Sequence, residues 1–202
     1  MVQLFQLKSN KISLEYKKAR KHKYAQLEKN GQLNLFENVE PNIFHLPVQN
    51  TPFEKALWLD EHDSEDAQEA YMKAILSGDH PADACCNLGL LEWKSGNLIK
   101  AFDYFSKSLK YDERHFEAHY NLANLYFENK DYRLAKLHYE IAAEIHPDYP
   151  KIYFNLGIVY ALLDFYEEAC LALQHYKSLI PKKAGKKADN LLKGLLNSLS
   201  KN

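Results

Sequence analysis

The sequence predicts an all-α protein, a solenoid of stacked helix pairs, from three observations. Three consecutive windows of 34 residues, 82–115, 116–149 and 150–183, align without a gap. Each window has two stretches with apolar residues at the i, i+3, i+4, i+7 spacing of an amphipathic helix. A short polar turn such as "KSGN" separates the two stretches. A constant period of this length indicates a repeat architecture rather than a single globular core.

The windows share small residues at two positions and larger apolar residues at a third. They are Gly89, Ala123 and Gly157 at position 8, Ala101, Ala135 and Ala169 at position 20, and Phe105, Tyr139 and Leu173 at position 24. Small residues allow two helices to approach closely, and the larger side chains fill the space between pairs. We therefore expect each window to be an antiparallel helix pair that buries its apolar faces only together with its neighbours.

This pattern resembles the tetratricopeptide repeat (TPR), whose consensus is W-x2-L-G-x2-Y, then A-x3-F, then P. Pro147 and Pro181 close the second and third windows at the position of that proline. The resemblance implies a right-handed α–α superhelix in which the first helix of each pair lines a concave groove. It also implies a non-catalytic role in protein–protein interaction, as a scaffold or adaptor.

Residues 48–81 are interpreted as a degenerate TPR that precedes the other three. Thr51 and Glu54 have the spacing of a capping box, with Pro52 in the first helical turn. The apolar residues of this first helix slip out of register with the later windows. We therefore expect a shortened turn between its two helices.

The apolar pattern of residues 184–202 predicts a C-terminal capping helix over the exposed face of the last repeat. Its apolar stripe consists of Leu191, Leu192, Leu195, Leu196 and Leu199. Since this helix is both amphipathic and basic, binding to an anionic membrane surface is the alternative.

Residues 1–47 are interpreted as a basic N-terminal arm followed by an extended segment. The run "KKARKHK" at residues 17–23 has five Lys/Arg, and the alternative function is a regulator that contacts nucleic acid through this arm. The segment "GQLNLFE" before the repeats is similar to the junction in bacterial regulators that join a MerR-type DNA-binding head to TPRs. This similarity suggests a bacterial source, but the chain has no room for such a head.

Charge is segregated along the chain. Residues 48–176 carry 11 Lys/Arg and 22 Asp/Glu, whereas both ends are basic. Opposite fields of this kind favour association of the basic ends with the acidic body. A further alternative is therefore a structural assembly subunit whose groove is filled by its own chain or by a sister chain.

An asparagine recurs at position 6 of each window, as Asn87, Asn121 and Asn155. In the TPR resemblance this position faces the concave groove, where the three side chains would form a ladder. An Asn amide both donates and accepts, so it can pair with the backbone of an extended peptide of any sequence.

The predicted peptide-binding site also includes the neighbouring groove positions. They are Tyr120, Phe154, Leu90, Asn124, Ile158, Trp93, Phe127 and Lys151. An exposed apolar wall of this kind typically marks an interaction site. The predicted ligand is therefore an extended, apolar peptide or protein segment.

Chaperone-binding TPR domains resemble this chain but bind a C-terminal carboxylate through Lys and Arg side chains at set groove positions. Only Asn121 and Lys151 match those positions, and two others carry the acidic residues Asp83 and Glu117. We therefore do not expect the chain to bind a chaperone tail.

No motif for catalysis, for a metal or for a cofactor is found in the sequence. It has no C-x2-C or H-E-x-x-H spacing, no phosphate-binding glycine loop and no G-x-S-x-G. Three cysteines make a poor disulfide framework, and no apolar run has the length of a membrane span or of a secretory signal. We expect a cytoplasmic monomer or weak homo-oligomer that binds a protein or peptide rather than nucleic acid.

Overall fold

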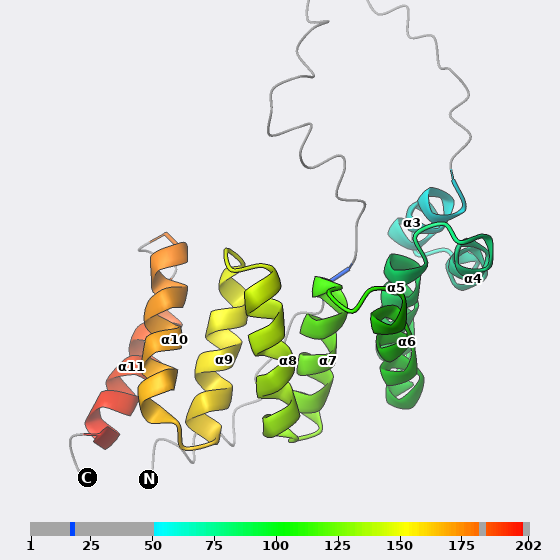
Figure 1. The fold of residues 1–202 in the computed structure, drawn as a ribbon. Helices are drawn as coiled ribbons and strands as arrows, with labels where there is room; N and C mark the ends of the chain where they lie inside the picture. Colours follow the sequence, from blue (N-terminus) through cyan, green and yellow to red (C-terminus); the bar gives the residue numbers. More distant parts are fainter. Residues whose placement is uncertain (1–16, 19–50, 182–184, 200–202) are drawn as a thin grey trace, which may run out of the picture.

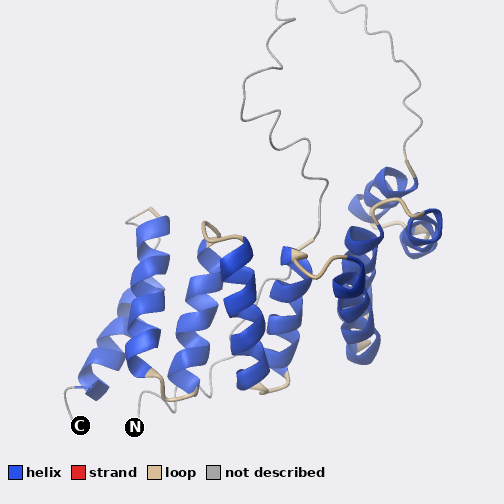
Figure 2. Cartoon of the chain, in the orientation of Figure 1, coloured by secondary structure: helices blue, strands red, loops and turns tan. Residues whose placement is uncertain are grey.

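The computed structural model describes residues 17–18, 51–181 and 185–199 of the chain. Within these ranges every regular element is a helix (Figure 2). The helices are α3 (Pro52–Glu61), α4 (Ala67–Ser77), α5 (Pro81–Lys94), α6 (Leu98–Tyr111), α7 (Phe116–Glu128), α8 (Tyr132–Ile145), α9 (Pro150–Leu162), α10 (Tyr166–Leu179) and α11 (Lys186–Leu199). None of these described helices is both long enough and apolar enough to cross a membrane.

The helices follow one another along an extended row (Figure 1). The main contacts join each helix to its neighbours in sequence, from α3 with α4 to α10 with α11. The three predicted windows correspond to the pairs α5–α6, α7–α8 and α9–α10. The predicted fold class, an all-α TPR-type solenoid, is confirmed.

The small residues at position 8 lie against the larger side chain at position 24 of the same pair. A Cβ atom added at Gly89 would lie 2.6 Å from the Phe105 ring, and one added at Gly157 would lie 2.6 Å from Cγ of Leu173. Phe105 and Leu173 are fully buried. Close approach of the two helices in each pair is thus set by the absence of a side chain on the first helix.

The α3–α4 pair begins with the predicted capping box. The Thr51 hydroxyl accepts from the Glu54 backbone, and the Glu54 carboxylate accepts from the Thr51 backbone. The prediction of a shortened turn is wrong, because residues 62–66 separate α3 from α4, whereas only residues 95–97 separate α5 from α6. The helix α3 is instead the shortened part, with 10 residues against 14 in α5. The chain instead reverses direction through Asp63, which takes a left-handed φ of 50°.

The C-terminal helix α11 packs against the last helix pair. Ala188, Leu192 and Leu195 of α11 are buried in a cluster that contains Ala169 and Leu173 of α10. An ion pair between Lys177 of α10 and Asp189 of α11 adds a polar contact at its edge, with 2.5 Å between Nζ and Oδ1. Apolar surface that would otherwise end the array in solvent is therefore covered.

Candidate functional site

The side chain of Asn121 on α7 binds the backbone of Lys17. The Lys17 amide donates to Oδ1 of Asn121 at 2.8 Å, and Nδ2 of Asn121 donates to the Lys17 carbonyl at 2.8 Å. One side chain thus satisfies both backbone groups of a residue 104 positions away in sequence. In Figure 1 this segment is the short blue stretch beside one end of α7.

The ammonium group of Lys17 lies between two rings and a carboxylate. Its Nζ is 4.2 Å from the centre of the Phe116 ring and 4.4 Å from that of Tyr149. Oε1 of Glu117 lies 3.6 Å away, and the Glu117 side chain is buried. Ring faces and a carboxylate both attract a cation, so this pocket has the chemistry for a lysine side chain.

The next residue, Lys18, reaches a different helix. Its Nζ pairs with Oδ2 of Asp60 on α3 at 2.5 Å. The same oxygen accepts a hydrogen bond from the Tyr71 hydroxyl at 2.9 Å, and Nδ2 of Asn87 donates to that hydroxyl at 3.2 Å. The first predicted ladder residue, Asn87, is therefore linked to Lys18 through Tyr71 and Asp60.

We refer to Asn121, Phe116, Glu117, Tyr149 and Asp60 together as the lysine site. The site combines one main-chain contact with two separate side-chain contacts, and all five residues belong to α3, to α7 or to the residue before α9. These are the first helices of their pairs, on which the sequence places the predicted groove.

Burial lowers the pKa of the Lys17 ammonium, and the attraction of Glu117 acts in the opposite direction. Burial likewise raises the pKa of the Tyr149 hydroxyl, and the charge of Glu117 adds to this shift. The electrostatic pattern is that of a half-buried cation held by a buried anion.

The His115 ring lies 3.9 Å from the Glu117 carboxylate and also contacts Asp83. His115 is the N-cap of α7, where its Nδ1 accepts from the Ala118 amide, so Nε2 carries the proton and donates to Asp83 at 2.9 Å. Burial opposes ionisation of Asp83, but hydrogen bonds from His115 and His80 hold the pKa of its carboxyl below its ordinary value. Asp83 is thus engaged within the fold, whereas Glu117 contacts the lysine.

The other predicted amides, Asn124 and Asn155, lie in a buried network farther along the array. Asn155 donates to the Tyr139 hydroxyl at 3.1 Å, and Tyr139 in turn donates to Oδ1 of Asn124. Longer contacts from Nδ2 of Asn155 reach the Tyr120 hydroxyl at 3.4 Å and Asn124 at 3.5 Å. The structure therefore places these residues together, with polar contacts between α7, α8 and α9.

The predicted apolar wall is only partly exposed. Tyr120 is 1% exposed and belongs to the core between α7, α8 and α9, and Leu90 and Ile158 are also buried. Trp93, Phe127 and Phe154 are half-buried, and Lys151 is exposed. Tyr120 differs from the expectation because Phe116, Tyr139 and Tyr149 pack around its ring.

Four residues of the site were not among the predicted ligand contacts: Phe116, Glu117, Tyr149 and Asp60. In the sequence, Glu117 stands out only as a mismatch to the chaperone-binding pattern. The sequence feature that points to this contact is the opposite charge of the acidic residues 48–176 and the basic arm, residues 1–47, which includes Lys17 and Lys18. That signal indicates an attraction but does not identify the carboxylates that form the contact.

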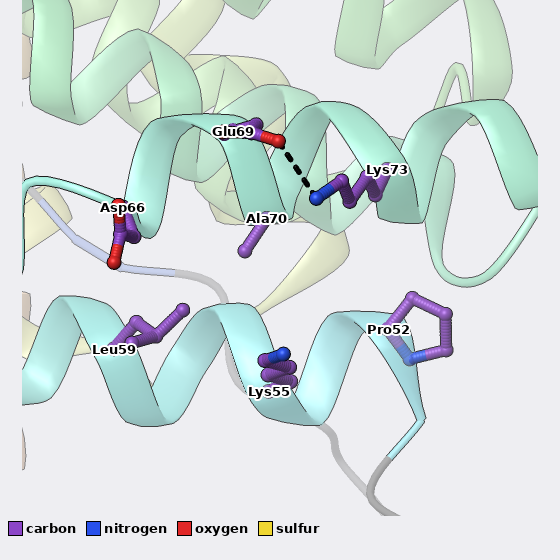
Figure 3. A pocket seen from close by; sticks show the side chains of 7 residues that line it. All are labelled: Pro52, Lys55, Leu59, Asp66, Glu69, Ala70 and Lys73. Carbon is purple, nitrogen blue, oxygen red and sulfur yellow. Dashed lines mark ion pairs between the residues drawn. The ribbon is translucent and has the colours of Figure 1, made fainter.

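A separate hollow of about 490 Å³ lies between α3 and α4 (Figure 3). Pro52, Lys55 and Leu59 of α3 face Ala70 and Asp66 across it, and Glu69 pairs with Lys73 on α4 at 2.7 Å. Both side chains of that ion pair are largely exposed, so the pair is accessible to water and weak. The hollow shows no convergent set of buried polar groups.

Among the described residues, no group of three or more His, Cys, Asp or Glu side chains could hold a metal ion. Cys85, Cys86 and Cys170 are free thiols, and all are buried. Burial raises the pKa of the Cys86 thiol well above its ordinary value, which opposes formation of a reactive thiolate.

Family models match two parts of the chain. A model described as "Tetratricopeptide repeat" matches residues 82–115, and one described as "TPR repeat" matches residues 123–164. The first match covers the same residues as the first 34-residue window. Together with the solenoid fold, these matches support a TPR protein.

Solved TPR structures share this fold at low sequence identity. The first TPR of Spaghetti (RPAP3), bound to the HSP90 peptide SRMEEVD, is 24% identical over 59% of this chain and 95% of that chain, with a TM-score of 0.53. MamA from Desulfovibrio magneticus RS-1 is 20% identical over 72% of this chain and 92% of that chain, with a TM-score of 0.57. MamA from AMB-1 is 17% identical over 74% and 81%, with a TM-score of 0.63. These similarities establish the fold alone.

Proposed function

We propose that the chain is a non-catalytic interaction scaffold that holds an extended segment of a partner protein in its concave groove. The observation that carries this proposal is the pair of hydrogen bonds between Asn121 and the backbone of Lys17. Both bonds go to main-chain groups, so the same contact is available to any extended segment, whatever its side chains.

The side-chain contacts support a ligand of mixed character. Half-buried rings at Trp93, Phe127 and Phe154 are suited to the apolar side chains predicted from the sequence. At Asn121 the adjacent carboxylates Glu117 and Asp60 favour a cation instead. We propose an extended segment with basic residues beside Asn121 and apolar residues beside the rings.

The acidic site supports the exclusion of a chaperone-type ligand. The HSP90 peptide in the Spaghetti structure, SRMEEVD, contains two glutamates and an aspartate. Similar acidic groups would be repelled by Glu117 and Asp60 here. A carboxylate-binding function is therefore not proposed for this chain.

Two alternatives from the sequence are affected by the position of residues 17–18. Lys17 and Lys18 belong to the basic run considered for nucleic-acid binding, but here both are paired with protein carboxylates. The same contacts favour the alternative in which the chain fills its own groove. We retain that alternative as a second function, a structural assembly subunit that pairs through this segment.

The peptide-binding proposal is tested by capture of proteins from an extract of the source cells. The comparison is between the wild-type chain, Asn121→Ala and Asn190→Ala, in which an exposed asparagine of α11 is changed in the same way. We expect Asn121→Ala alone to lose the captured partner, with a Tm close to that of the wild type. Retention of the same partner by Asn121→Ala would contradict the proposal.

A single substitution is preferable to removal of all three ladder residues. Asn87 and Asn155 donate to the buried hydroxyls of Tyr71 and Tyr139. Their loss would remove a hydrogen-bond donor from each of these buried hydroxyls and would destabilise the fold. The Asn121 side chain bonds to the backbone of Lys17 and to the Cys86 sulfur, so its replacement affects the site more selectively.

A further inference from the structure

We propose that the lysine site is selective for an extended segment with two consecutive lysines. Residues 17–18 of this chain are its resident occupant, which a partner segment of the same chemistry must displace. The proposal rests on the function proposed above, in which Asn121 binds the main chain, and adds the class of ligand and its regulation.

The two lysine side chains go to separate carboxylates on different helices. Successive side chains of an extended backbone point in opposite directions. Lys17 reaches Glu117 at the start of α7, whereas Lys18 reaches Asp60 at the end of α3. Asn121 holds the backbone of Lys17 in place. Because the two carboxylates are fixed on different helices, a ligand reaches both only if its two lysines are adjacent in sequence.

The surroundings of Lys17 discriminate against neutral and acidic side chains. The Glu117 side chain is 5% exposed, and its cationic contact is the Lys17 ammonium at 3.6 Å. Nδ1 of His115 lies 3.9 Å away, but it accepts from the Ala118 amide and carries no proton. A neutral ligand side chain would leave this buried carboxylate poorly compensated, which is unfavourable. The rings of Phe116 and Tyr149 add attraction that an uncharged chain of equal length lacks.

The resident occupant has the advantage of being tethered to its site. A covalently linked segment competes at an effective concentration set by its linker, which reaches the millimolar range for short flexible linkers. Removal of the two lysine side chains should therefore open the site to a free peptide. The contacts are partly ionic, so binding of that peptide should weaken as salt is raised.

The test uses the full-length chain and a fluorescent peptide that copies residues 12–23. Affinity is measured by fluorescence anisotropy for the wild type and for the Lys17→Ala/Lys18→Ala variant. A matched peptide carries norleucine only at the positions of Lys17 and Lys18, which keeps the aliphatic length and removes these two charges. Thermal denaturation confirms that each protein variant is folded.

We expect the double variant to bind the lysine peptide at least tenfold more tightly than the wild type does. In the same background the norleucine peptide should bind at least tenfold more weakly than the lysine peptide. Adding Glu117→Gln should weaken the lysine peptide severalfold. It should strengthen binding of the norleucine peptide, because the buried charge that disfavours a neutral side chain is gone. Adding Asn121→Ala should weaken both peptides, because it removes the main-chain contact.

Each failure has a distinct meaning. Equal affinity for the two peptides, with Asn121→Ala weakening both, would overturn the lysine selectivity and leave main-chain binding intact. Equal affinity of the wild type and the double variant would overturn the resident-occupant proposal. Binding that Asn121→Ala does not change would remove the proposed function on which both depend.

Discussion

His119 of α7 and His138 of α8 face each other with their Nδ1 atoms 2.9 Å apart. Nε2 of His119 lies 2.9 Å from the carbonyl oxygen of Glu113, so Nε2 carries a proton and donates to that oxygen. In a neutral ring, Nδ1 of His119 then accepts from Nδ1 of His138. The Tyr126 ring stacks on His138, with ring centres 5.4 Å apart. Two neutral imidazoles therefore join the helices of the central repeat.

The histidine pair predicts that the protein loses stability in weak acid. Burial, reinforced by His119, lowers the pKa of His138 from 6.5 to about 4, and burial also lowers that of His119. Between pH 4 and pH 6.5, these histidines therefore bind more protons in the unfolded chain than in the folded chain. The free energy of unfolding consequently rises with pH across this range. We expect the free energy of unfolding to fall by about 2 kcal/mol from pH 6.5 to pH 4. Urea denaturation at a series of pH values measures this slope.

Acidic residues also titrate in this range, so the histidine contribution needs a matched comparison. His138→Phe keeps a ring against Tyr126 and removes the imidazole that takes up a proton in weak acid. Its stability should therefore fall less steeply than that of the wild type as the pH is lowered. His175→Phe, at an exposed position of α10, should retain the wild-type slope. Identical slopes in all three proteins would contradict the prediction.

Gly89→Ala should destabilise the first complete repeat. The added Cβ would lie 2.6 Å from two atoms of the buried Phe105 ring, which is too rigid to move aside. Overpacking typically costs about 1–3 kcal/mol. The higher helix propensity of alanine offsets about 1 kcal/mol of this cost. We expect a net loss of about 1 kcal/mol, measured by thermal denaturation.

The cause is checked by repeating Gly89→Ala in a Phe105→Leu background. The smaller, more flexible leucine leaves room for the methyl group, so the second substitution should reduce the effect of the first. Such coupling is expected between residues in direct contact. An equal effect in both backgrounds, or a higher Tm in Gly89→Ala, would rule out the steric explanation.

The helix pairs were predictable because their determinants are local and repeat. The contact between Gly89 and Phe105 follows from positions 8 and 24 of one window, and the same relation holds for Gly157 and Leu173. The capping box at Thr51 depends on residues three apart in sequence. Interactions of this kind are specified by spacing along a helix, which the sequence shows directly.

The lysine site was less predictable because its parts are far apart in sequence. The repeated position of Asn121 predicts a contact with the main chain of a peptide, and this stays a prediction. In the structure the Asn121 side chain bonds to the backbone of Lys17 in the same chain. The sequence did not distinguish Glu117 and Asp60 from the other acidic residues of the body, since spacing alone does not give burial. Tyr120 was assigned to the groove wall because the packing of later residues around it was not apparent.

Glu92 provides a test of packing between the first two helix pairs. Its carboxylate is buried and accepts hydrogen bonds from Gln68 of α4 at 3.2 Å and from Asn97 of the α5–α6 turn at 2.8 Å. Gln68 and Asn97 are exposed and would bond to water in Glu92→Ala. The cost is therefore that of the lost hydrogen bonds to a charged acceptor, about 1–3 kcal/mol. Chemical denaturation should show this loss.

Glu92→Gln is the conservative comparison, because its amide oxygen keeps one acceptor. It should lose less stability than Glu92→Ala. Glu144→Ala, on the exposed surface of α8, should change the free energy of unfolding by less than about 0.5 kcal/mol. If Glu92→Ala is as stable as Glu144→Ala, the carboxylate does not stabilise the junction.

The adjacent leucines of α11 test the cap on the last repeat. Leu195 is 3% exposed and belongs to the cluster with Leu173 of α10, whereas Leu196 is 55% exposed. Leu195→Ala should therefore cost about 2–3 kcal/mol, and Leu196→Ala should cost much less. Because each repeat is stabilised mainly by its neighbours, the effect should be greatest near the end of the array. Hydrogen exchange should accelerate in α9 and α10 of Leu195→Ala while α5 and α6 keep their wild-type rates. Equal acceleration in both regions would show that the array unfolds as one cooperative unit and that α11 stabilises all of it.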